Sequence, residues 1–160
     1  MRIRFVKRAD GGAVLRCERP DGSVVWQRQD GRRGRFFPPH DLTHYAVETT
    51  LGFRDGFYGL VAEGWEITDF GSPWPRGPVP DGALATEFLV GLFDQERATG
   101  VVQSIDDVNL YGSRFFAEHG RSGSWRCVTD DALVRARAVA TALIERWQGL
   151  APDEAIEVEF

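Results

Sequence analysis

The chain has 160 residues, of which 42% are hydrophobic and 27% are charged, and its formal net charge is −5. This composition is ordinary for a folded globular protein and too apolar for a disordered chain. No stretch approaches the roughly 18 consecutive apolar residues that a membrane-spanning helix needs, so we expect no membrane partner. The length predicts a single domain over residues 1–160.

Cellular context is indicated by the first residues and by the use of cysteine. The start, MRIRFVKRAD, lacks the continuous apolar core of a signal peptide, and this favours a cytoplasmic protein. Cys17 and Cys127 lie far apart and make no metal-type spacing, which predicts reduced thiols. Lys7 is the only lysine among nineteen basic residues, a genome bias that suggests a bacterial source.

Charge is unevenly distributed along the chain. Residues 1–35 carry ten basic and four acidic side chains, whereas the rest carry nine basic and twenty acidic ones. Such a split is typical of an interaction surface, and equally of one domain whose basic sheet faces acidic helices. The overall acidity and the lack of an RNP-like aromatic pattern argue against a nucleic-acid partner.

Strands are predicted at both ends of the chain. Polar and apolar residues alternate through residues 1–30, and the breaks at DGG and PDG predict a three-stranded antiparallel meander with one exposed face. The last residues, 155–160, alternate in the same way. Glu157 and Glu159 would complement Arg2 and Arg4 if the last strand paired beside the first.

Helices are predicted between the two ends. The proposed ranges are 39–51, about 54–64, 83–98 with Asp81 as its cap, and 129–149, and residues 108–123 stay ambiguous. Together with the strands, these helices predict an α+β fold in which an antiparallel sheet packs against about four helices, with residues 39–149 mainly helical. The apolar faces of 87–100 and 129–149 are both candidates for a homodimer interface.

Two of the three histidines lie in HDLTH, residues 40–44. On a regular helix, His40, His44 and Glu48 form one stripe at i, i+4 spacing. Two imidazoles one turn apart reach a common point at the distance that zinc requires, and a catalytic zinc needs one further protein ligand. The candidates for that ligand are Glu48, Glu63, Glu66, Asp69 and His119.

HDLTH also resembles the HExxH signature of zinc metallopeptidases, with Asp41 where the general base glutamate stands. In the thermolysin-like branch of that superfamily a glutamate on the next helix completes the site, and Glu63 or Glu66 lies at a comparable distance downstream. The resemblance covers five residues and implies Asp41 and Glu63 as catalytic candidates. Aspartate is one methylene shorter than glutamate, and the motif stands at the predicted start of its helix.

Three interpretations of the histidine helix remain open. The histidines are structural, or they bind a divalent metal such as zinc in a hydrolase-like cleft, or they belong to a polar acid–base cleft without a metal. A further alternative is a non-catalytic interaction module for a protein or a polyanion. It would use the basic N-terminal sheet or the loop at 64–80, which contains four prolines and two tryptophans.

Overall fold

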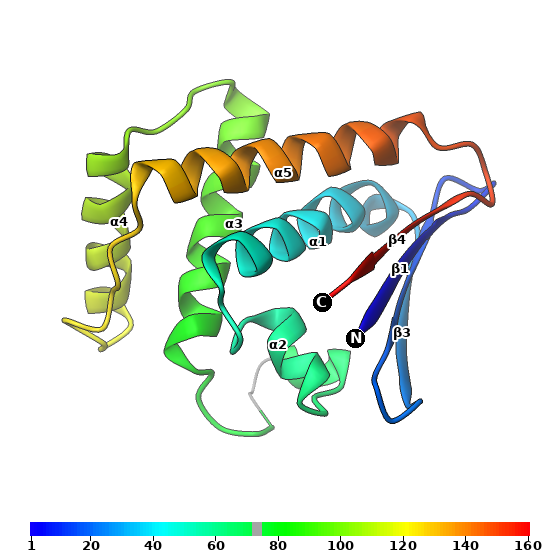
Figure 1. Cartoon of the computed structure of the whole chain (residues 1–160), viewed down its shortest axis with the longest axis horizontal. Helices are drawn as coiled ribbons and strands as arrows, with labels where there is room; N and C mark the ends of the chain where they lie inside the picture. Colours follow the sequence, from blue (N-terminus) through cyan, green and yellow to red (C-terminus); the bar gives the residue numbers. More distant parts are fainter. Residues whose placement is uncertain (72–74) are drawn as a thin grey trace.

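The computed structural model describes residues 1–71 and 75–160 and shows an α+β fold (Figure 1). Four antiparallel strands form one sheet in the order β3-β2-β1-β4. Their bounds are β1 Arg2–Lys7, β2 Ala13–Glu18, β3 Val24–Gln29 and β4 Ala155–Glu159. The predicted fold class and the place of the C-terminal strand beside the first strand are therefore confirmed.

The charges on β1 and β4 match as the alternation predicted. Arg2 lies opposite Glu159 and Arg4 lies opposite Glu157. The Nε atom of Arg2 is 3.5 Å from a carboxylate oxygen of Glu157 and 3.6 Å from one of Glu159. Each such exposed ion pair contributes only about a few tenths of a kcal/mol to stability. Together the pairs favour β4 as the neighbour of β1.

The helical segments lie between β3 and β4. They are α1 Arg32–Leu51, α2 Phe57–Ala62, the short 3-10 helix η1 Ile67–Phe70, α3 Asp81–Thr99, α4 Ile105–Glu118 and α5 Asp130–Gly149. Most of the segment whose structure the sequence left ambiguous is helix α4, and the side chain of Ser104 caps it by accepting from the amide of Asp107. None of the described helices is long and apolar enough to cross a membrane.

Helix α1 starts seven residues earlier than the predicted range of 39–51. Pro38 and Pro39 suggested a helix start, because proline suits a first turn, but both lie inside the helix. The extra turns begin at Arg32, where Gly34 packs against the end of β3 and the β1–β2 turn. A Cβ atom on Gly34 would lie 2.6 Å from the carbonyl oxygen of Gln29 and 2.8 Å from Cα of Gly12.

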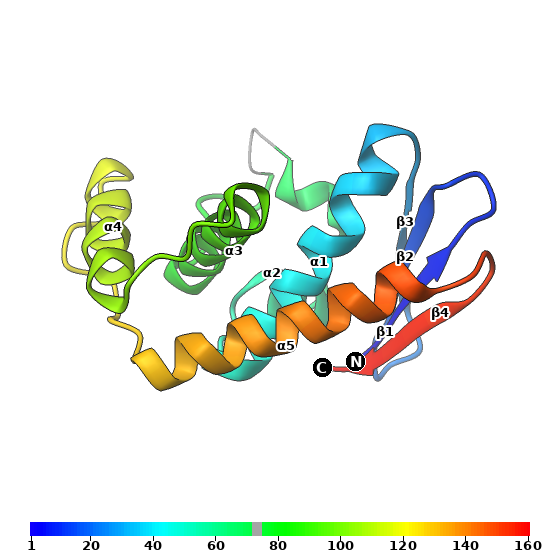
Figure 2. The ribbon, with the colours of Figure 1, turned by 90° about the horizontal axis from the view of Figure 1, so that it is seen from above.

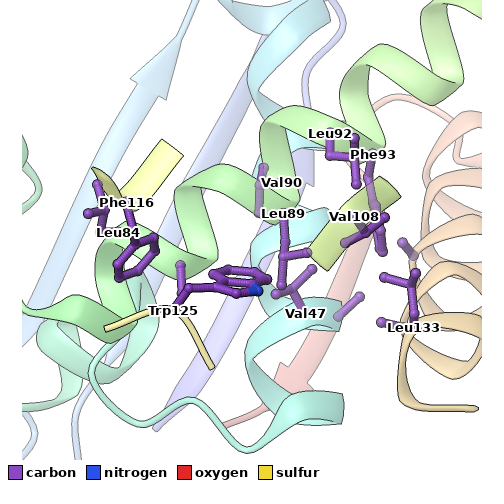
Figure 3. Packing of buried hydrophobic residues seen from close by; sticks show 14 residues of the cluster. Val47, Leu84, Leu89, Val90, Leu92, Phe93, Val108, Phe116, Trp125 and Leu133 are labelled. Carbon is purple, nitrogen blue, oxygen red and sulfur yellow. The ribbon is translucent and has the colours of Figure 1, made fainter. Parts of the chain in front are cut away.

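Two buried apolar clusters share helices α1 and α5. One lies between the sheet and these helices and includes Phe5, Leu15 and Leu42. The other lies between these helices and the pair α3 and α4 and includes Val47, Leu89, Leu133 and Trp125 (Figure 3). Seen from above, the sheet, α1, α3 and α4 follow one another, and α5 runs alongside them from the end near α4 to the sheet (Figure 2).

The apolar faces that suggested a dimer interface are largely used inside the chain. Leu89, Val90 and Phe93 of α3 are buried in the cluster that also takes Leu133 and Ala136 of α5. The loop at 64–80 is partly described: Trp65 packs against Phe70, whereas Pro73 and Trp74 lie outside the described residues.

Candidate functional site

His40 and His44 lie side by side on α1, as the i, i+4 spacing predicts. Their ring centroids are 4.9 Å apart. His40 is partly buried, and His44 is only 3% exposed. The ring of Phe57, at the start of α2, lies 5.4 Å from that of His44. The two imidazoles therefore share one small region between α1 and the elements packed on it.

Helix α3 brings two acidic side chains to these histidines. It crosses α1 at a steep angle (Figure 1), and Glu87 and Asp94 are seven residues apart on it, which is two helical turns. Oε1 of Glu87 lies 3.5 Å from Nε2 of His44. Oδ2 of Asp94 lies 2.7 Å from Nδ1 of His40. Each histidine thus faces a carboxylate from the crossing helix.

His40, His44 and Glu87 form a group that could hold a metal ion. One donor atom from each lies within 4.8 Å of the others. Because Nδ1 of His40 is engaged by Asp94, Nε2 is the nitrogen that this ring has free. The donor atoms around a tetrahedral zinc ion are about 3.4 Å from one another. Small rotations of the three side chains would bring their donor atoms to this separation. Two imidazoles and one carboxylate are a ligand set typical of catalytic zinc.

The group opens into a pocket of about 330 Å³. All three of its side chains line this pocket, together with Asp41, Phe57 and other residues of β3, α1 and η1. Arg33, in the first turn of α1, is exposed and also lines it. A metal held by the three side chains would therefore be reachable by a small molecule.

Glu48 is not part of the group, although it follows the histidines at the predicted spacing. It is fully buried, and its Oε2 atom accepts hydrogen bonds from the amides of Tyr58 at 2.9 Å and Gly59 at 3.1 Å. The carboxylate thus binds the first turn of α2. The structure brings Glu87 of α3, and not Glu48, to the histidines as the third donor.

Glu48 nevertheless lies behind His44. Its Oε1 atom is 3.5 Å from Nδ1 of His44, but the two form no hydrogen bond, and both carboxylate oxygens accept from the amide of Tyr58. Nδ1 of His44 is buried and has no hydrogen-bond partner among the described residues. A buried unpaired imidazole nitrogen costs free energy and is uncommon in folded proteins.

Asp41 lines the same pocket from the side of the sheet. It is 5% exposed, and its Oδ2 atom accepts a hydrogen bond of 2.7 Å from the side-chain amide of Gln29 on β3. Burial raises the pKa of Asp41 to about 7, against the opposing effect of the Gln29 hydrogen bond. Asp41, which the sequence suggested as a general base, is thus one of the residues that line the pocket.

The protonation of the two histidines differs. Burial lowers the pKa of His44 to about 4, so this ring is neutral at neutral pH and carries a lone pair on one nitrogen. For His40, burial acts to lower the pKa, but the hydrogen bond with Asp94 and the charge of Asp41 outweigh it and the net pKa is raised. Burial acts to raise the pKa of Asp94, but the hydrogen bond with His40 outweighs it, and the net pKa is lowered.

The other predicted candidates lie away from the group. Glu63 is exposed at the C-terminal end of α2. Glu66 contacts Arg19 at 3.3 Å, and Asp69 pairs with Arg76 at 2.7 Å. His119 is exposed at the end of α4, with Nδ1 2.7 Å from the carbonyl of Phe115. None of these four side chains is in the group formed by His40, His44 and Glu87.

Sequence reasoning did not identify Glu87 and Asp94. Both lie in the helix predicted at 83–98, and their spacing of seven residues places them on one side of it. Two acids at this spacing are also typical of a solvent-exposed helix face, so the pattern alone does not single them out. Only the crossing of α3 over α1 distinguishes them from the other acids of the chain.

Comparison with known proteins adds no further assignment. No family model, no curated protein and no solved structure matches the chain.

Proposed function

We propose that the protein binds a divalent metal ion, with zinc as the first choice, through His40, His44 and Glu87, and uses it for hydrolysis in the adjoining pocket. The observation that carries the proposal is the convergence of three donor atoms within 4.8 Å on the wall of a pocket. The same donor set also suits ferrous iron, so elemental analysis has to identify the ion.

The surroundings of the histidines support this proposal. Metal-binding histidines usually donate their second ring nitrogen to a carboxylate, which orients the ring and makes it a stronger ligand. Asp94 holds this position for His40 at 2.7 Å. Glu48 lies at 3.5 Å on the corresponding side of His44, close enough to accept from Nδ1 after a small rotation of the ring.

The residues around the pocket suggest how hydrolysis would proceed. Zinc held by His40, His44 and Glu87 would supply a water molecule whose pKa is lowered to about 7. Asp41 lines the pocket next to His40, and we propose it as the base that takes a proton from the water. Glu63, the other catalytic candidate from the sequence, lies at the C-terminal end of α2 and is not among the residues that line this pocket.

The proposal is tested by elemental analysis of protein purified without chelators. We expect one equivalent of a transition metal, lost in the double variant His40→Ala, His44→Ala and strongly reduced in Glu87→Gln. His119→Ala is the matched control, because it removes the remaining histidine, which lies outside the group. Failure of zinc to bind, with an unchanged melting temperature when zinc is added, would rule out the metal site.

A second candidate function is an interaction module, and one observation favours it. Trp26 is 64% exposed, and its neighbour on the same face, Val24, is 39% exposed. Both lie on β3, which is an edge strand of the sheet, and exposed apolar edges are typical of protein contacts. We propose a second copy of this chain as the partner. Light scattering that shows a dimer for the native chain and a monomer for Trp26→Ser would support it, and a native monomer would exclude it.

The polyanion version of this module has less support. Two arginines on the same sheet face have acidic partners: Arg2 contacts Glu157 and Glu159, and Arg16 contacts Glu18 at 2.7 Å. Their charge is thus balanced within the sheet. Binding to a polyanion that weakened steeply with salt would contradict this assessment.

A further inference from the structure

A second, larger hollow adjoins the pocket of the histidines. It has a volume of about 740 Å³, compared with about 330 Å³ for the first. Phe57, Phe70 and Glu87 line both. Phe57 is in contact with His44 on one side, with a centroid distance of 5.4 Å, and with Phe70 on the other, at 4.7 Å. We call the larger hollow the α3–α4 groove.

The walls of the α3–α4 groove are mostly apolar. Besides the two shared phenylalanines, they include Val79, Ala83 and Leu84 around the start of α3, and Phe115 of α4. Glu87 lines both hollows, so its carboxylate lies where the groove meets the metal group, the name used below for His40, His44 and Glu87. A ligand that fills both hollows would thus place an apolar part in the groove and its polar part at the histidines.

The basic side chain of Arg121, on the groove wall, does not offer a free charge. Arg121 pairs through Nη1 with the carboxylate of Asp81, and its Nη2 atom donates to the carbonyl of Val79 at 2.6 Å. Nδ1 of His119, also on the wall, is directed at the carbonyl of Phe115. Among the described residues that line the groove, no free guanidinium is left for an anionic group, and the mostly apolar wall favours a neutral one.

We infer that the α3–α4 groove binds the neutral acyl or aryl body of the substrate, an ester or amide whose scissile bond lies at Glu87 and the two histidines. This inference rests on the proposed function and adds the class of substrate to it. Hydrolysis adds water across the bond, releases a carboxylic acid and an alcohol or amine, and needs no other reactant. The groove and the metal group make separate contributions to binding, so they can be tested separately.

The first experiment tests the groove alone, on metal-free protein. N-phenyl-1-naphthylamine is a neutral dye that becomes fluorescent in apolar sites, and it has no metal-binding group. We expect saturable binding that weakens about tenfold in Ala83→Leu, which narrows the groove, and in Phe115→Ala, which removes part of its wall. Leu110→Ala is the control, because Leu110 is an exposed apolar residue of the same helix α4 that does not line the groove.

The second experiment joins the groove to the metal. Alkyl hydroxamic acids bind zinc through their head group, and acetohydroxamic and octanohydroxamic acids differ by six methylenes. On zinc-loaded protein we expect affinity to rise about fourfold for each buried methylene, and Ala83→Leu to reduce this gain while leaving acetohydroxamic acid unaffected. Circular dichroism of Ala83→Leu and Phe115→Ala is the control that tests whether both groove variants are folded.

The outcomes separate the two proposals. Zinc-dependent hydroxamate binding without any effect of chain length would overturn the inference about the groove and leave the metal site intact. Dye binding that responds to the groove variants, combined with hydroxamate affinities that do not depend on zinc, would overturn the metal site instead. Dye binding that is equal in Ala83→Leu, Phe115→Ala and Leu110→Ala would overturn the groove.

Discussion

His40 reaches the metal group with one ring nitrogen already engaged, since its Nδ1 atom lies 2.7 Å from Asp94. The carboxylate selects the ring orientation in which Nε2 is free. Asp94 is itself held from the other side by Arg97, at 2.8 Å. The order of the contacts, from Arg97 to Asp94 to His40, indicates that Asp94 would act on a bound metal through the imidazole and not directly.

Replacing Asp94 tests this role at the scale of one residue. Asp94→Asn keeps the shape of the side chain but removes the charge that favours a donor on Nδ1 of His40. We expect zinc affinity to fall by about 10- to 100-fold, measured by calorimetric titration. Arg97→Ala is the control, because it removes the second partner of Asp94 without touching His40. Equal losses in both variants would contradict a specific role of the carboxylate.

The two thiols provide a second test at this scale. Cys17 is buried in the sheet, and burial raises its pKa to about 12. Since the thiolate is the reactive form, Cys17 stays protonated and unreactive at pH 7–9. Cys127 is exposed and free.

We expect one thiol per chain to react with a disulfide reagent such as Ellman's in the native protein, and two after denaturation. In Cys127→Ser the native protein should show none. Rapid labelling of Cys17 in that variant would mean that the sheet opens readily.

At the scale of the element, two helical glycines have opposite surroundings. Gly34 in α1 is buried, and an added Cβ would lie 2.6 Å from a backbone oxygen. Gly91 in α3 is exposed, and an added Cβ would meet nothing within 4 Å. Alanine is the better helix former in both places, but only Gly91 has room for it.

We expect Gly34→Ala to lower the free energy of unfolding by about 1–3 kcal/mol, because the helix must move away from β3. Gly91→Ala should raise it by about 0.5–1 kcal/mol, in line with the intrinsic preference of alanine. Urea denaturation followed by circular dichroism measures both. A stabilised Gly34→Ala protein would show that α1 does not pack against the sheet end as described.

At the scale of the whole molecule, the two apolar clusters are connected through α1. Leu42 of this helix belongs to the cluster under the sheet, and Val47 to the cluster against α3. Because one continuous helix takes part in both, loss of either cluster removes support from the other. The site between α1 and α3 depends on this connection, since its proposed metal ligands come from both helices.

We therefore expect the domain to unfold in one cooperative transition. Leu15→Ala in the first cluster and Leu89→Ala in the second should each lower stability by about 2–5 kcal/mol, and each should shift the whole transition. Tryptophan fluorescence and circular dichroism, recorded during the same urea titration, would give coincident curves. Two separate steps in either variant would mean that the clusters fold independently.

Much of the fold could be predicted because it depends on local patterns. The alternation of Ile3 and Phe5 with Arg2 and Arg4 indicates which face of β1 is buried. The glutamates that alternate in β4 have the charge that complements these arginines, and this favours the two strands as neighbours. The helix start was less predictable: Pro38 and Pro39 favour a first turn, and the added turns depend on a contact between Gly34 and β3 that has no local signal.

What the sequence by itself determined about the site is the placing of His40 and His44 on one side of a helix, since the period of the α-helix alone requires it. Which acid joins them was decided only in the tertiary structure. Glu48 has the right spacing, but the amides of Tyr58 and Gly59 bind its carboxylate. Glu87 is distant in sequence and becomes the third donor because α3 crosses α1. A side chain's partners depend on the groups packed around it, and helical spacing specifies only the face from which it starts.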